Sequence, residues 1–271
     1  MLKEYKILIN GAWRATSRPL DVTSPFDKTV VGRTYLASNA ELKEAVDGAE
    51  AAFRELRSWP SYRKAAVIQK VVDGIKERSD ELAKIIALEA GKPIKDSRVE
   101  VKRAMSTFQL ALEETKRLGG EVLPLDIMEG SEGRFGILRR FPVGVVLGIS
   151  PFNFPLNLVA HKVAPAMACG CPIIIKPASK TPLTALVLGD IITNAGWPDG
   201  GVNVVPARGE DAEKLLDDDR IKKLTFTGSP VVGWRLKAKA GQKKVTLELG
   251  GNAGVIVHSD ADIGLAAKRC A

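Results

Sequence analysis

The stretch VGVVLGISPFNFPLNLVAHKVAPAMACGCPIIIKP, residues 143–177, determines the predicted fold. It opens with an apolar run at 143–150, which is typical of a strand buried on both faces of a sheet. A helical pattern follows from Pro155 to Ala168, and a second apolar run occupies 171–177. Strand, helix and strand in this order predict a right-handed βαβ unit with two parallel strands.

The same alternation continues beyond this unit. We expect three more helices and three more strands, the helices at 181–194, 212–218 and 230–240 and the strands at 201–207, 222–228 and 243–251. Five parallel strands with flanking helices predict a Rossmann-like α/β fold, and such sheets bind ligands at the C-terminal ends of their strands. A ligand pocket is therefore expected along that edge, where the strands end in polar or glycine-rich clusters at 150–153, 176–179, 206–209, 227–229 and 248–251.

The chain before residue 143 is expected to wrap this core. Residues 5–37 read as short strands, and the turn dipeptide Asn10-Gly11 favours a hairpin. Ser38, followed three residues later by Glu41, predicts a helix start. Amphipathic helices, three or four in number, then continue to Leu118, with breaks at Trp59-Pro60 and Gly91-Lys92-Pro93. Residues 119–142 read as a protruding hairpin, which would serve either as an oligomer contact or as ordinary surface.

Composition argues against several classes of protein. The chain has 271 residues, of which 45% are apolar, enough for a packed core. Its three cysteines are too few for a disulfide framework, and no apolar run reaches the roughly 18 residues of a membrane helix. The net charge is +8, but basic residues alternate with acidic ones, so we expect no nucleic-acid partner. We expect a soluble, cytoplasmic protein without a membrane partner.

Common ligand-binding fingerprints are absent from the sequence. It contains neither GxGxxG nor GxxxxGK[ST], and no His/Cys spacing is typical of zinc, so we expect no metal site. We interpret His161, in a predicted helix, and His258, after a strand, as structural or solvated. Cys169 and Cys171 flank a helix-to-strand turn and are interpreted as structural thiols.

Four segments taken together resemble the NAD(P)-dependent aldehyde dehydrogenase family. They occur in the family's order and read SPFNFP (150–155), IIIKPASKTPLTAL (173–186), FTGSPVVG (226–233) and LELGGNAG (247–254). In addition, GKPIKDSRVEV (91–101) is similar to the family's helical stretch before the hairpin. The resemblance runs through essentially the whole chain. It implies an aldehyde dehydrogenase-like fold that is incomplete, because this chain stops a little past the midpoint of a family member.

The resemblance implies two catalytic residues. Asn153 is similar to the family's oxyanion-hole asparagine, whose amide donates to the oxygen on which negative charge develops. Glu248 is similar to the general base that activates water to hydrolyse a thioester. Its strand, 245–249, is otherwise apolar, so we expect a carboxylate at the end of a buried strand with a raised pKa.

The resemblance also implies a dinucleotide site. Lys176 is similar to the lysine that binds the adenosine ribose, and Gly228-Ser229 to the turn beneath the pyrophosphate, at a helix N-terminus. Ser179 stands where NAD-specific members commonly carry an acid. Without that acid a 2′-phosphate is not repelled, so we expect NADP to be preferred, with NAD also usable. The expected cofactor-binding residues are Ile149, Ser150, Pro151, Phe152, Lys176, Ala178, Ser179, Lys180, Gly209, Phe226, Gly228, Ser229, Val232, Leu249 and Gly250.

The family's mechanism needs a nucleophilic cysteine, which the resemblance implies would lie beyond Ala271. Cys270 does not have the nucleophile's setting, and we interpret it as a cysteine that packs in the core from a helix beginning near Asp262. We expect no turnover if the chain truly ends at Ala271. The resemblance divides the chain into N-terminal strands and helices (1–118), the hairpin (119–142), the dinucleotide-binding core (143–258) and the start of a connection to a catalytic domain (259–271).

Three functions remain open at this point. The first is oxidation of a small aldehyde to a carboxylic acid in a homo-dimer or homo-tetramer, with lactaldehyde, succinate semialdehyde and glyceraldehyde 3-phosphate as candidate substrates. The second is a catalytically inactive, dinucleotide-binding truncation. The third is an acylating, CoA-dependent reaction, against which Glu248 argues, because a hydrolytic base is unnecessary when CoA takes the acyl group.

Overall fold

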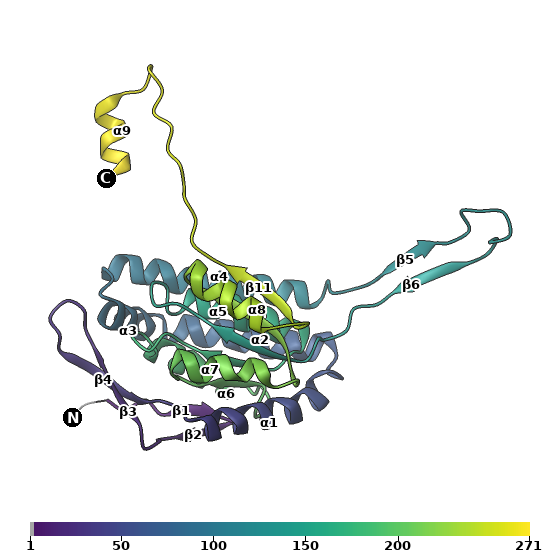
Figure 1. The fold of residues 1–271 in the computed structure, drawn as a ribbon, viewed down its shortest axis with the longest axis horizontal. Coiled ribbons are helices and arrows are strands. Elements are labelled where there is room, and N and C mark those ends of the chain that lie inside the picture. The colour runs from purple at the N-terminus through teal and green to yellow at the C-terminus, as the bar shows by residue number, and fades with distance from the viewer. Residues whose placement is uncertain (1–2) are drawn as a thin grey trace.

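The computed structural model describes residues 3–271, and its centre is a seven-stranded sheet (Figure 1). The strand order is β11-β10-β7-β8-β9-β1-β2. The five strands that the sequence predicted to be parallel do pair in parallel. They are β7 (Val145–Ile149), β8 (Ile173–Lys176), β9 (Val202–Val204), β10 (Ile221–Thr227) and β11 (Lys244–Glu248). The α/β fold expected from the alternation of strands and helices is therefore confirmed.

The N-terminal strands complete this sheet, which the sequence did not predict. β1 (Ile7–Ile9) and β2 (Ala12–Arg14) form the expected hairpin, in which Asn10 and Gly11 both have positive φ. β1 then pairs antiparallel with β9 through Leu8 and Val204. A second hairpin, β3 (Pro19–Thr23) and β4 (Val30–Tyr35), forms a separate two-stranded sheet.

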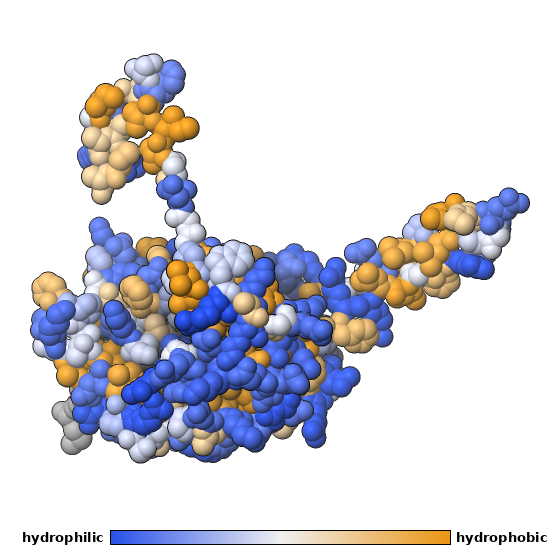
Figure 2. Space-filling model, viewed as in Figure 1, coloured by the Kyte–Doolittle hydropathy of each residue, from blue (hydrophilic) through white to orange (hydrophobic). Residues whose placement is uncertain are grey.

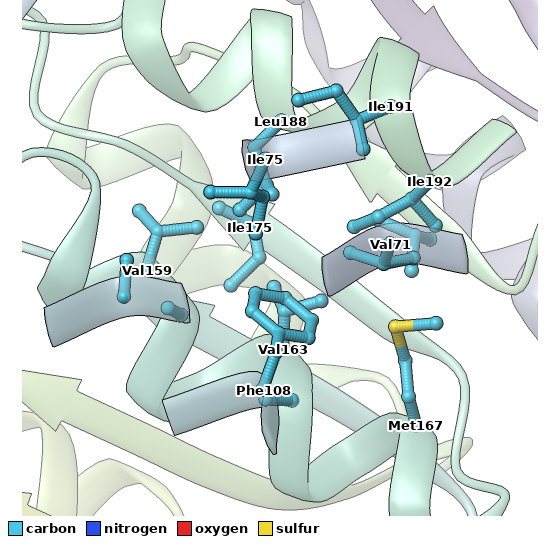
Figure 3. Close-up of a cluster of buried hydrophobic side chains, with 14 of the residues drawn as sticks. Val71, Ile75, Phe108, Val159, Val163, Met167, Ile175, Leu188, Ile191 and Ile192 are labelled. Atoms are coloured by element: carbon cyan, nitrogen blue, oxygen red, sulfur yellow. The ribbon is translucent and has the colours of Figure 1, made fainter. Parts of the chain in front are cut away.

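Helices cover both faces of the sheet because the buried strands are apolar on both sides. In β8, Ile173 and Ile175 face one hydrophobic cluster and Ile174 faces the other. The first cluster packs against α2 (Ser61–Glu77), α3 (Ser79–Ala90), α4 (Ile94–Thr115), α5 (Asn157–Cys169) and α6 (Leu183–Asn194). Figure 3 shows its centre, where Phe108 of α4 lies among side chains from α2, α5 and α6. The second cluster packs against α1 (Asn39–Leu56), the short 3₁₀ turn (Leu215–Asp217) that follows α7 (Gly209–Lys214), and α8 (Pro230–Lys239).

Most helix ends follow the sequence signals, with two differences. Ser38 and Glu41 form the predicted capping box at the start of α1. The helix predicted at 212–218 instead begins at Gly209 and continues from Leu215 as a short 3₁₀ turn (Leu215–Asp217). α2 and α3 are separated at Arg78, where no glycine or proline marks the break.

The segment 119–142 forms the predicted hairpin and stands away from the body of the molecule (Figure 1). Its strands are β5 (Glu121–Pro124) and β6 (Phe135–Leu138). Its surface is largely apolar (Figure 2), because Val122, Phe135 and Ile137 are each at least 66% exposed.

Beyond β11 the chain leaves the body as an extended segment that ends in α9 (Ile263–Cys270) (Figure 1). No residue of α9 is buried against the part of the chain that the structure describes. The prediction that Cys270 packs in the core is therefore wrong, since this thiol is exposed. Among residues 3–271, no helix combines the length and apolar character needed to cross a membrane.

Candidate functional site

Parallel pairing brings the ends of four strands to one level. Ile149 of β7 pairs with Lys176 of β8 on one side and with Phe226 of β10 on the other. Thr227, the last residue of β10, pairs with Glu248, the last residue of β11. The polar clusters that follow these strands therefore begin side by side along one edge of the sheet.

Asn153 lies in the short loop between β7 and α5 and is exposed. Two hydrogen bonds hold the backbone of this loop in place. Ser150 N donates to Lys176 O over 3.2 Å, and Lys92 Nζ donates to the carbonyl oxygen of Asn153 over 2.9 Å. Because these contacts use backbone atoms, the side-chain amide of Asn153 stays available to donate to a ligand.

Glu248 is placed differently from the sequence prediction. β11 is an edge strand of the sheet, its residues alternate between exposed and half-buried, and Glu248 itself is exposed. The expectation of a carboxylate at the end of a buried strand is therefore wrong. The backbone of Glu248 is nevertheless well held, because its carbonyl oxygen accepts from Gly228 N over 3.1 Å.

The residues around Lys176 have the properties of a site for a polar ligand. Burial lowers the pKa of Lys176, and no carboxylate or other side chain among residues 3–271 offsets it. The neighbouring Ser150 hydroxyl is buried and has no hydrogen-bond partner within the same residues. A half-buried ammonium and a buried hydroxyl without partners are costly unless a ligand supplies hydrogen bonds. Ribose hydroxyls and phosphate oxygens can supply these hydrogen bonds, so these residues fit a dinucleotide.

The glycines of the β10–α8 turn and of α8 itself leave no room for a side chain. A Cβ on Gly228 would lie 2.6 Å from the ring of the buried Phe226, and a Cβ on Gly233 would lie 2.3 Å from Leu249. Ser229 caps α8 by accepting from Val232 N. The first turn of a helix presents unpaired N–H groups that favour an anion, so this turn fits a phosphate group.

The other predicted cofactor residues lie around these two centres. Phe152, Ser179 and Lys180 line one cavity of about 480 Å³ beside β3. Half-buried Pro151 and Ala178 belong to the loops after β7 and β8, and exposed Gly250 follows β11. Exposed Gly209 begins α7, which lies beside α8 through an ion pair of Glu213 and Arg235 (2.9 Å). Within residues 3–271, no hydrogen bond or ion pair joins Gly209 to Lys176 or to Gly228.

Sequence reasoning missed Lys162, a buried lysine near Glu248. It projects from α5 toward β10, where its Nζ lies 2.7 Å from Thr227 Oγ1. Burial lowers the pKa of Lys162 to about 8, an effect that the charge of Glu248 opposes. A signal was present, because Lys162 interrupts the otherwise apolar core-facing positions of α5.

A second cluster of cationic groups was also missed. The Lys92 ammonium and the Arg103 guanidinium lie 3.7 Å and 5.5 Å from the ring centroid of Phe154, the residue after Asn153. His161 is exposed, and its pKa is lowered by partial burial and by the charges of Arg103 and Lys162. In the described part of the chain, Arg103 has no carboxylate within 4.0 Å. Its guanidinium can therefore donate hydrogen bonds to an anion from outside the chain. The packing of α4 on α5 brings Arg103 and His161 to the same region, and Lys92 reaches it from the turn before α4.

The ionisable side chains do not form a metal centre in the described residues. No group of three or more His, Cys, Asp or Glu side chains there could hold a metal ion. The acceptors and donors along the strand ends are suited to an organic ligand with hydroxyl and phosphate groups.

Comparison with known proteins identifies the family of this chain. The model of the "Aldehyde dehydrogenase family" matches residues 13–271. A 3-sulfolactaldehyde dehydrogenase of Priestia megaterium is 40% identical over 98% of this chain and 56% of its own length, and a lactaldehyde dehydrogenase of Methanocaldococcus jannaschii is 40% identical over 96% and 56%.

A solved structure agrees with these relatives. The NADP-dependent glyceraldehyde-3-phosphate dehydrogenase of Bacillus halodurans, complexed with NADP, superposes with a TM-score of 0.93 at 33% identity, over 99% of this chain and 57% of that one. The chain thus spans about half the length of the proteins it matches. With the family model covering nearly all of its residues, the chain belongs to the aldehyde dehydrogenase family.

Proposed function

We propose that this chain is the cofactor-binding portion of an NAD(P)-dependent aldehyde dehydrogenase that oxidises an aldehyde to a carboxylic acid. The observation that carries the proposal is the edge of the sheet at which β7, β8, β10 and β11 end together. It brings an exposed asparagine, a half-buried lysine without a side-chain partner in the described residues and a strand-end glutamate into one region.

Each of these residues has a role in the proposed reaction. The Asn153 amide donates to the aldehyde oxygen and stabilises the negative charge that forms there when a thiolate attacks. Glu248 takes a proton from the water that releases the acid from the thioester. When bound, the nicotinamide ring of the dinucleotide would supply the hydride acceptor. The resemblance to the family implies that the nucleophilic cysteine lies in sequence beyond Ala271. Within residues 3–271, Cys171 is buried, and Cys169 and Cys270 lie outside the strand-end loops.

We also propose that the cofactor is NADP in preference to NAD. Lys180 is exposed beside half-buried Ser179, and both line the cavity next to Phe152. A hydroxyl and an ammonium attract a 2′-phosphate, whereas an acid at position 179 would repel it. The Bacillus halodurans relative, which is NADP-dependent, supports this preference.

Among the three candidate substrates, we propose that aldehydes bearing an anionic group are preferred. Arg103 is not paired with a carboxylate in the described residues and lies near Phe154, next to the oxyanion donor Asn153. Two relatives are named for aldehydes with a sulfonate or a phosphate, and one for the uncharged lactaldehyde. The charge of Arg103 favours the first class.

Substitution of Arg103 tests the substrate class. The whole gene product is assayed for NADP reduction with succinate semialdehyde and with butanal, which differ by one carboxylate. Arg103→Met should raise KM for succinate semialdehyde by about 10- to 100-fold, the worth of one charge-assisted contact, and leave butanal nearly unchanged. The control is Lys102→Met, which changes an exposed residue next to Arg103 on α4 and should change the KM for neither aldehyde. Equal losses with both aldehydes would refute the substrate class, and no oxidation by the wild type would refute the activity.

The remaining parts of the proposal concern assembly and location. The exposed apolar hairpin of β5 and β6 is suited to joining copies of the chain into a homo-dimer or homo-tetramer. The dinucleotide site and the free thiols accord with a cytoplasmic enzyme that binds neither nucleic acid nor membrane.

A further inference from the structure

One buried carboxylate ties the loop that carries Asn153 to α4. Glu100 is fully buried, and its Oε1 accepts from the backbone N–H groups of Leu156 (2.9 Å) and Asn157 (3.2 Å), at the start of α5. Its Oε2 lies 2.5 Å from the ammonium of Lys92. Glu100 therefore fixes one end of the loop and, at the same time, holds a lysine.

Lys92 reaches the middle of the same loop. Its Nζ donates to the carbonyl oxygen of Asn153 over 2.9 Å and lies 3.7 Å from the ring centroid of Phe154. Its side chain is only 16% exposed, so its position is well defined. The lysine and the glutamate together contact the backbone of Asn153 itself and of Leu156 and Asn157, three and four residues later.

A second buried glutamate shows that helix capping alone does not require such a pair. Glu89 accepts from Leu183 N (2.8 Å) and Thr184 N (3.0 Å) at the start of α6. Among residues 3–271, no lysine or arginine is paired with Glu89. The feature that distinguishes Glu100 is thus its lysine, and that lysine contacts the residue proposed to bind the oxyanion.

We infer that Lys92 and Glu100 are positioning residues that hold the Asn153 amide where the oxyanion forms. The inference rests on the proposed function and deepens it. An oxyanion donor acts only when it is held at the correct distance in advance, and a shift of a few tenths of an ångström weakens it. With Glu100 removed, Lys92 would lose its counter-ion and turn to solvent, and the Asn153 carbonyl would lose its donor.

The test measures kcat, KM and the Kd for NADP in the whole gene product. Lys92→Met and Glu100→Gln should each lower kcat by about 10- to 100-fold, less than the loss of an oxyanion donor itself, while the Kd for NADP changes less than twofold. Lys92→Arg, which keeps a donor, should restore most of kcat. In an Asn153→Ala background, Lys92→Met should change kcat less than twofold, because the residue it positions is already gone.

Hydrogen exchange provides a readout independent of turnover. Backbone amides in residues 150–160 should exchange faster in Lys92→Met than in the wild type. The control Arg220→Met removes ion pairs to Asp47 (2.6 Å) and Asp218 (2.7 Å) at the opposite end of β10, so it should lower stability without changing kcat or this exchange.

Two results would overturn the inference. One is a kcat within twofold of the wild type in Lys92→Met with unchanged exchange in 150–160. The other is an equal loss of kcat with and without Asn153. Absence of aldehyde oxidation by the wild-type protein would instead refute the proposed function, and the inference with it.

Discussion

At the scale of single residues, Lys162 carries the largest electrostatic cost near the site. Its Nζ has Thr227 Oγ1 as its close partner at 2.7 Å, and burial lowers its pKa to about 8 from an unperturbed value of 10.5. Between these two values the unfolded chain binds a proton that the folded chain has released. The free energy of unfolding therefore rises with pH across this window, and below pH 8 the folded protein bears the full cost of a buried charge.

Substitution of Lys162 should remove this dependence on pH. In wild-type protein, the Lys162 contribution to the free energy of unfolding should rise by about 1–3 kcal/mol between pH 8 and pH 10.5. Urea unfolding of Lys162→Met at several pH values should show a shallower slope and higher stability near pH 7. Lys102→Met, with an exposed side chain, is the control. Identical slopes in wild type and Lys162→Met would contradict this account.

At the scale of elements, the helices of the sheet are anchored by buried carboxylates from the N-terminal helices. Glu89, at the end of α3, caps α6, and Glu100, within α4, caps α5. Burial raises the pKa of Glu89 to about 7, against the hydrogen bonds from Thr184 and Leu183. These contacts link residues between 56 and 95 positions apart and hold the helices that follow two of the strand-end loops.

Loss of the Glu89 cap should destabilise the whole domain. Glu89→Ala leaves the N–H groups of Leu183 and Thr184 buried without an acceptor, so we expect a loss of about 1–3 kcal/mol in the free energy of unfolding. Glu77→Ala, at the exposed end of α2, should change it by less than about 0.5 kcal/mol. Denaturant titration measures both. An equal free energy of unfolding in the two variants would show that the Glu89 cap does not stabilise the domain.

The sequence predicted the elements of this fold better than their contacts. Local signals predicted the five parallel strands, the Asn10-Gly11 turn and the cap at Ser38, because each depends on neighbouring residues. The pairing of β1 with β9 and the role of Glu100 depend on residues far apart in sequence, and a glutamate in a charged helix looks solvated. The predicted burial of Glu248 was wrong for residues 3–271, because a strand's apolar residues do not reveal that it is the last strand of the sheet within them.

At the scale of the whole molecule, two segments project from a well-packed body (Figure 1). The hairpin of β5 and β6 exposes Val122, Phe135 and Ile137, and the segment after β11 exposes Ile256 and its neighbours. Exposed apolar surface of this extent is typical of surfaces that contact other protein. The hairpin is the part that we propose for contact between copies.

Polar substitutions on the hairpin should therefore lower the association state. Val122→Ser and Ile137→Ser change side chains that are 72% and 66% exposed, so the fold of the body should not change. Light scattering of the double variant should give the mass of one subunit, whereas the wild type should give that of a dimer or tetramer. An unchanged oligomer in the variant, or a monomeric wild type, would contradict the assignment.

The central claim is that the strand ends form a dinucleotide site, and a titration of the whole gene product with NADP and NAD tests it most directly. We predict saturable binding of both, tighter for NADP. Lys176→Ala should weaken binding of both dinucleotides by at least about tenfold, since it removes the half-buried ammonium. Ser179→Glu should weaken binding of NADP more than binding of NAD. Failure of the wild type to bind either dinucleotide, or equal affinities in wild type and Lys176→Ala, would contradict the account.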